Sequence, residues 1–152
     1  MVWPATRILI DGLHERPLAR AVLLACALVL VPLVWIALRL RGGAGLGAAL
    51  VSSGNRPADA PALRDLQRLG AIVNRAARMT LLPATCLARA LVLRWMLARV
   101  GVDARLVIGA KPAGDRLAAH AWIEVDGKPI NERGDVGREF APLAYASRIA
   151  PF

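Results

Sequence analysis

Apolar residues recur at helical spacing in two stretches of the second half of the chain. Between residues 62 and 79 they return every three or four positions, with most of the arginines in between, which predicts an amphipathic helix. Residues 86–100 are apolar around most of a helical circumference, a pattern typical of a central, buried helix. Thr85 is a suitable N-cap and Gly101 a suitable C-cap. The pattern therefore predicts a buried helix that begins at Cys86.

The period of the pattern then changes from helical to alternating. Residues 104–110 and 119–125 are predicted to be strands, and the polar residues 111–116 between them a loop. The Asp–Gly pair at 126–127 is a hairpin turn signal, after which residues 129–132 are predicted to return as a third strand. Two helices followed by an antiparallel meander predict an α+β fold, with the buried helix packed on the sheet.

The N-terminal part of the chain has a different character. Residues 1–41 are interpreted as an apolar helical segment, because residues 21–38 carry no charge and are just long enough to cross a bilayer. A proline inside this run, Pro32, is tolerated better in a membrane helix than in a soluble one. Two interpretations stay open, membrane association and packing of the helix on the protein's own core. Glycine, serine and proline mark residues 42–61 as a linker, which leaves residues 62–152 as the main domain.

Composition excludes several classes of function. The 152 residues carry a net charge of +9, which points to an anionic partner, a membrane surface or simply an arginine-rich genome. The arginines are scattered and do not alternate with aromatic residues, so nucleic-acid binding is not expected. Two cysteines and two histidines spread over the chain do not have the spacing of a metal site. Neither a phosphate-binding glycine loop nor a Gly-x-Ser-x-Gly motif is present, and no cofactor is expected.

Cys86 stands out among the remaining candidates because it lies at the start of the buried helix. The first N–H groups of a helix have no partner within it and the helix dipole is positive there, so a thiolate is favoured. The same N–H groups can stabilise an oxyanion during acyl transfer. The alternative is that Cys86 is a small buried apolar residue, which is the commoner role of a single cysteine.

His120 is the candidate base for Cys86. It is the second residue of a predicted strand, and its small neighbours Ala119 and Ala121 leave room for a substrate chain beside the ring. Trp122 shares its strand face. A cysteine–histidine pair becomes an activated nucleophile when the ring reaches the sulfur and a third group fixes the ring.

The predicted hairpin nominates the third group. A three-residue loop would place Glu132 directly opposite His120, on the same face of the sheet. A two-residue turn would shift the register and move Glu132 to the other face, leaving Asn131 or Asp135 as substitutes. Glu124 shares the strand face of His120 but is four residues away, too far to hold the ring.

Four motifs together resemble the lasso-peptide leader peptidases, which belong to the transglutaminase-like superfamily of papain-like folds. The match covers roughly residues 65–145, and the order and spacing of its parts are more specific than any one of them. The motifs are Cys86-Leu-Ala-Arg-Ala90, Gly101-Val-Asp-Ala-Arg-Leu-Val-Ile-Gly109, His120-Ala-Trp-Ile-Glu-Val-Asp-Gly127 and Phe140-Ala-Pro-Leu143.

The resemblance implies a catalytic triad. The cysteine and histidine of the family fall on Cys86 and His120, and its third member, usually Asp, falls on Glu132. Glutamate is one methylene longer and still accepts an imidazole N–H, but the departure keeps Asp135 as a candidate.

The resemblance also implies a function, namely hydrolysis of the bond between leader and core of a lasso-peptide precursor. The implied partners are that precursor, a separate leader-recognition protein and an ATP-dependent macrolactam synthetase, and the chain length suggests a stand-alone peptidase. Such an enzyme is expected in the cytoplasm, attached to the inner face of the cell membrane if residues 1–41 associate with lipid. Two alternatives stay open, a transglutaminase-type acyl transferase and a non-catalytic, basic, membrane-associated scaffold.

Overall fold

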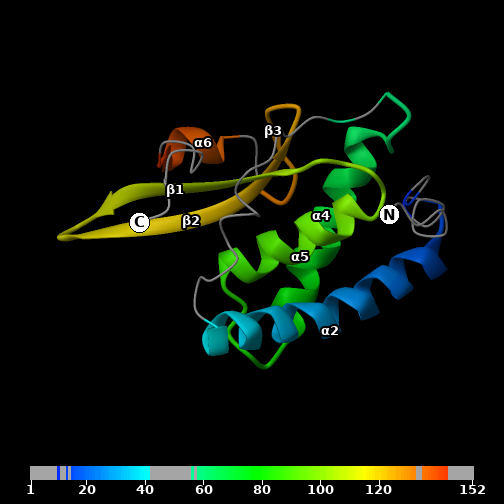
Figure 1. The fold of residues 1–152 in the computed structure, drawn as a ribbon, viewed down its shortest axis with the longest axis horizontal. Coiled ribbons are helices and arrows are strands. Elements are labelled where there is room, and N and C mark those ends of the chain that lie inside the picture. The colour runs from blue at the N-terminus through cyan, green and yellow to red at the C-terminus, as the bar shows by residue number, and fades with distance from the viewer. Residues whose placement is uncertain are drawn as a thin grey trace.

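Three long helices lie on one side of an antiparallel sheet in the part of the chain that the structure describes (Figure 1). The computed structural model describes residues 10, 13, 15–41, 56, 58–132 and 135–143. Its elements in chain order are α2 (Pro17–Arg41), α4 (Leu63–Met79), α5 (Cys86–Ala98), β1 (Arg105–Ala113), β2 (Arg116–Val125), β3 (Lys128–Pro129), α6 (Val136–Glu139) and β4 (Ala141–Pro142).

The two predicted helices of the second half are confirmed. The first, α4, begins one residue later than predicted, and α5 begins at Cys86 as expected. Thr85 caps α5, since its side-chain oxygen accepts a hydrogen bond from the Ala88 amide at 3.2 Å. Gly101 follows the end of α5 with a φ of 79°, a left-handed conformation that favours glycine and ends the helix.

The strands form one sheet in the order β3-β2-β1-β4, and the pairings of neighbouring strands are antiparallel. The loop predicted at residues 111–116 is wrong, because β1 continues to Ala113 and pairs there with Arg116. Gly114, with a φ of 62°, allows a two-residue turn that keeps both strands in register. The residues near the turn of this hairpin are exposed and largely polar, as the residues of a loop are. The pattern therefore predicts a loop where the two strands continue.

Each face of the sheet has its own apolar contacts. On the helix side, side chains of β1 and β2 join the main core with α2, α4 and α5; they are Leu106, Ala121, Ile123 and Val125. On the opposite face a smaller cluster contains Val107, Trp122 and Val136, with Phe140 packed against it. The α+β arrangement predicted from the pattern, with the Cys86 helix packed on the sheet, is therefore present.

The apolar N-terminal helix packs on the same core. α2 contacts both α4 and α5, and the buried residues along it are four or so positions apart: Ala19, Leu23, Ala27 and Val31, each at most 5% exposed. By length and composition its residues Pro17–Leu40 are also able to cross a membrane. The linker predicted at residues 42–61 lies mostly outside the described residues, and the division into segment, linker and domain stays a prediction.

The packing of α2 predicts a strong difference between its two faces. Leu23→Ala removes a side chain that is 2% exposed, and we expect it to lower the free energy of unfolding by about 2–5 kcal/mol. Leu33→Ala, on the same helix but 54% exposed, is the matched control and should change it by less than about 0.5 kcal/mol. Thermal melts followed by circular dichroism measure both, and equal shifts would contradict this packing.

Candidate active site

Cys86 is the first residue of α5, at the end of that helix where backbone N–H groups lack helical partners. Its side chain is partly buried and packs against the main core. The helix that it begins packs on β2, the strand that carries His120. Both features predicted for Cys86 from the sequence, the capped helix start and the packing of α5 on the sheet, are present.

The turn between β2 and β3 has two residues, so the three-residue loop predicted here is wrong. Val125 pairs with Lys128, and the two residues between them, Asp126 and Gly127, have φ values of 51° and 70°. Two successive left-handed residues form the turn whose twist matches that of a hairpin, and an Asp–Gly pair favours it.

The third strand ends sooner than predicted. β3 stops at Pro129, and the Ile130 amide makes one further hydrogen bond to the Ile123 carbonyl, at 2.8 Å. The next position in the ladder is taken by a side chain, because the Ile123 amide donates to Oδ1 of Asn131 at 2.8 Å. Strand pairing is thereby replaced by a side-chain contact, and the backbone after Asn131 is free to leave the sheet.

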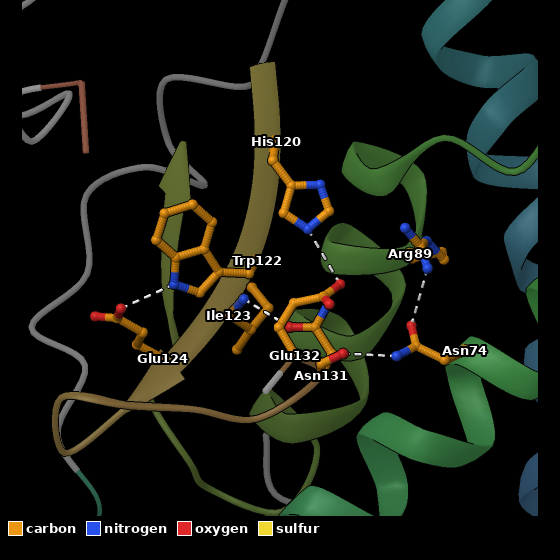
Figure 2. Close-up of polar contacts among 8 residues, drawn as sticks. All are labelled: Asn74, Arg89, His120, Trp122, Ile123, Glu124, Asn131 and Glu132. Atoms are coloured by element: carbon orange, nitrogen blue, oxygen red, sulfur yellow. Dashed lines mark hydrogen bonds and ion pairs between the residues drawn. The ribbon is translucent and has the colours of Figure 1, made fainter. Parts of the chain in front are cut away.

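Glu132 reaches His120 as a consequence. Its Oε1 lies 3.2 Å from Nε2 of His120, and both side chains are largely shielded, at 23% and 18% exposure. Figure 2 shows the ring and the carboxylate directed toward each other. The predicted contact is therefore present, although the register that predicted it is wrong. The two residues predicted as substitutes for Glu132 lie elsewhere. The Asn131 side chain accepts a hydrogen bond from the Ile123 amide, and Asp135 precedes α6.

Two aromatic side chains flank the imidazole. The Trp122 ring stacks at a centroid distance of 6.2 Å and the Phe140 ring lies 5.1 Å away. Trp122 is fully buried and its indole N–H donates to Oε1 of Glu124 at 2.8 Å. Glu124 thus accepts a hydrogen bond from the Trp122 indole, in agreement with the expectation that it does not hold the His120 ring (Figure 2).

One face of α4 fixes the segment that leads to Glu132. Gln67, Gly70 and Asn74, spaced along one side of the helix, all meet residues 129–131. The Asn74 amide donates to the Asn131 carbonyl at 2.6 Å, and a Cβ built on Gly70 would lie 2.4 Å from the Ile130 carbonyl oxygen. The backbones of α4 and this segment therefore approach as closely as a glycine permits.

The sequence pattern does not predict these contacts between α4 and residues 129–131. Arg89, one turn after Cys86, donates to Oδ1 of Asn74 at 3.4 Å and so joins α5 to the same network (Figure 2). Its Nε and the Nδ2 of Asn131 are buried without a hydrogen-bond partner among the described residues. The sequence does contain a signal for this contact. Gly70 and Asn74 lie four positions apart on an otherwise strongly predicted helix, and both residue types disfavour a helix. A tertiary contact explains their presence there better than helix propensity does.

The structure does not bring all three predicted residues into direct contact. Within the described residues, the Cys86 thiol and the His120 ring form no hydrogen bond, whereas His120 and Glu132 do meet. Because Nε2 faces Glu132, Nδ1 is the ring nitrogen left for a nucleophile. Catalytic hydrogen bonds are often long in the free enzyme and tighten when substrate binds.

The comparison with protein families decides the affiliation. The profile of the transglutaminase-like superfamily matches residues 27–145, which is more than half of the chain. The chain belongs to the transglutaminase-like superfamily. That superfamily includes cysteine peptidases and acyltransferases and generally works by cysteine-dependent catalysis. The comparisons with curated proteins and with solved structures gave no match.

The match to the superfamily begins within α2 and includes β4, so it spans both the packed N-terminal helix and the sheet. Among the described residues, no three His, Cys, Asp or Glu side chains are grouped as a metal site would require. The side chains at the candidate site are the Cys86 thiol, the His120 imidazole and the Glu132 carboxylate.

The close approach of α4 to residues 130–131 predicts opposite effects for two glycine substitutions. Gly70→Ala forces the helix and the segment apart, and we expect it to cost about 1–3 kcal/mol of stability. Gly137→Ala in α6 meets nothing within 4 Å and is the matched control. It should be neutral or stabilising by up to about 1 kcal/mol, because alanine favours a helix. Chemical denaturation measures both, and a neutral Gly70→Ala would contradict the contact.

Proposed function

We propose that this chain is a cysteine peptidase that removes the leader from a lasso-peptide precursor. Membership of the superfamily supports cysteine-dependent catalysis. The resemblance of the Cys86, Gly101, His120 and Phe140 motifs to leader peptidases supports the narrower activity. The observation that carries the proposal is the contact of His120 with Glu132, because a histidine held by a carboxylate is what an activated cysteine requires.

Cys86 is the nucleophile in this proposal. Its sulfur attacks the scissile carbonyl carbon while His120 takes up the thiol proton at Nδ1, and a C–S bond forms as the carbonyl becomes an oxyanion. The Cys86 amide lies in the first turn of α5, where backbone N–H groups lack helical partners, and in this proposal it donates to that oxyanion. Thr85 caps the helix through the Ala88 amide, which leaves the preceding N–H groups available.

His120 then acts as a general acid. It returns the proton to the leaving amine, the C–N bond breaks, and the leader stays bound to Cys86 as a thioester. A water molecule, deprotonated by the same ring, hydrolyses the thioester and regenerates the thiol. Glu132 accepts the Nε2–H throughout, so the ring keeps one orientation and its Nδ1 stays directed to the reacting atoms.

The proposed partners follow from the activity. They are the precursor peptide, a separate leader-recognition protein and an ATP-dependent macrolactam synthetase that closes the ring of the freed core. We place the enzyme in the cytoplasm, where precursor peptides are synthesised.

Transfer of the acyl group to an amine is the second candidate, because the superfamily includes acyltransferases. It uses the same three residues up to the thioester and differs only in the acceptor. A reaction in ¹⁸O-labelled water separates the two, since hydrolysis puts the label into the new leader carboxylate and transfer to an amine does not.

A cleavage assay with the precursor and the leader-recognition partner tests the proposal by mass spectrometry. Cys86→Ala and His120→Ala should abolish leader release, and Glu132→Ala should lower kcat/KM by about 10²–10⁴-fold. Glu132→Asp should restore part of it, because a carboxylate is again present.

Glu124→Gln is the matched control for Glu132, since it changes another carboxylate of the same region that bonds Trp122 and not His120. It should retain most of the activity. Cleavage that survives Cys86→Ala would remove Cys86 from the mechanism. If the folded protein cleaves nothing with all partners present, the peptidase proposal fails and the non-catalytic scaffold becomes the better interpretation.

A further inference from the structure

Arginines gather in a groove between α2 and α4, which we call the arginine groove. Its volume is about 650 Å³, and its charged residues are Arg20 from α2 and Arg68, Arg75 and Arg78 from α4. Of the described residues that line it, none belongs to the candidate active site. The arginine groove is therefore a second concave site, separate from the one that contains the proposed nucleophile.

Helix geometry places these charges on two facing walls. Arg75 follows Arg68 by two turns of α4, and Arg78 follows Arg75 by three positions, so the three side chains leave α4 on one side. Arg20 lies on the side of α2 that buries Leu23, and that side faces α4. With a rise of about 1.5 Å per residue, the charges on α4 extend over about 15 Å along the groove.

The two helices contain a single acidic residue to offset these charges. α2 has none, and Asp65 of α4 pairs with Arg68 at 2.9 Å. Arg20, Arg75 and Arg78 form no ion pair with another described residue. Guanidinium groups on facing walls repel one another, so this set opposes the packing of α2 on α4. An anionic ligand in the groove would remove the repulsion.

The floor of the arginine groove is aliphatic. Leu24 and Ile72 come from the two helices, are partly buried and pack against the main core. Ala21 and Ala71 also line the groove, and their small side chains keep it open. A ligand that fits the groove must therefore combine negative charges with apolar groups.

This combination favours a peptide over other anionic ligands. Single-stranded nucleic acid stacks its bases on aromatic side chains, and no aromatic residue is among the described residues that line the groove. A single phosphate ion is much smaller than the groove and leaves the aliphatic floor uncovered. A peptide offers both kinds of group, because its carboxylates accept paired hydrogen bonds from arginine and its aliphatic side chains cover the floor.

We propose that the arginine groove binds an acidic peptide segment of a partner protein. In this complex the carboxylates pair with Arg20, Arg75 and Arg78, and an aliphatic side chain of the peptide lies on Leu24 and Ile72. A groove length of about 15 Å holds about four or five residues of an extended chain. The proposal does not depend on the peptidase activity, since it concerns a surface that the candidate active site does not use.

Selection of binders from a phage library of random short peptides, with the full chain as the target, tests the proposal. The recovered sequences should place at least about two acidic residues within about five positions, next to leucine, isoleucine or valine. A synthetic peptide of the recovered sequence is then titrated by fluorescence anisotropy. A second peptide with glutamine at the acidic positions is its control and should not bind, and salt should weaken the binding of the first.

Two triple variants of equal charge locate the binding surface. The first changes the arginine groove: Arg20→Gln, Arg75→Gln and Arg78→Gln. The second is the matched control and changes three exposed arginines outside the groove: Arg64→Gln, Arg116→Gln and Arg138→Gln. The groove variant should weaken peptide binding by about a hundredfold, because charge-assisted hydrogen bonds are lost, and the control by less than about threefold.

Ala71→Glu places a carboxylate of the chain itself in the arginine groove. The new side chain lies three positions after Arg68 and four before Arg75, where it can pair with either. It should compete with the peptide and weaken its binding by at least about tenfold. Cys86→Ala should leave the affinity unchanged, so a failure of the peptidase proposal and a failure of this one are distinguishable.

Four results would overturn the proposal. They are recovered peptides without an excess of acidic residues, equal affinity losses in the two triple variants, binding that requires Cys86, and vesicles of phosphatidylglycerol that the same arginines bind in preference to the peptide. The last result would make a lipid phosphate the occupant of the groove. Circular dichroism of each variant shows that it is folded, so that a loss of binding reports on the groove.

Discussion

The hydrogen bond from the Ile123 amide to the Asn131 side chain is the contact on which the candidate site depends. It occupies the place where a further strand residue would pair with β2, so the chain leaves the sheet one residue before Glu132. The α4 contacts made by Gly70 and Asn74 then hold the departing backbone. Because residues 130–131 are held by β2 on one side and by α4 on the other, the Glu132 carboxylate lies beside the His120 ring.

The same contacts link the site to the rest of the core. α5 packs against α2, α4 and β2, and it carries Cys86 at its start and Arg89 one turn later. Arg89 bonds Asn74, which bonds the Asn131 backbone, so the helix of the proposed nucleophile and the segment of the carboxylate share one network. A change in the packing of these helices would therefore move two of the three proposed catalytic residues together, although they are far apart in the sequence.

The elements of this fold were largely predictable from the sequence, because their apolar periodicity is strong. The helix start at Cys86, with Thr85 as its cap, followed from local signals. The path to Glu132 did not, since it depends on an asparagine side chain that replaces a strand pair and on a glycine in α4 that touches a segment about 60 positions later. The contact of Glu132 with His120 is present although the register that predicts it is wrong, because the glutamate side chain reaches the ring from outside the sheet.

The reactivity of the two thiols tests the central claim on the protein alone. Iodoacetamide attacks thiolates, and Cys26 in the same chain is the more exposed of the two cysteines. If His120 activates Cys86, then Cys86 is alkylated faster than Cys26 despite its partial burial. The excess should disappear in His120→Ala and shrink in Glu132→Ala, while Cys26 stays unchanged. A Cys86 that reacts more slowly than Cys26, at a rate that His120→Ala leaves unaltered, would contradict the account.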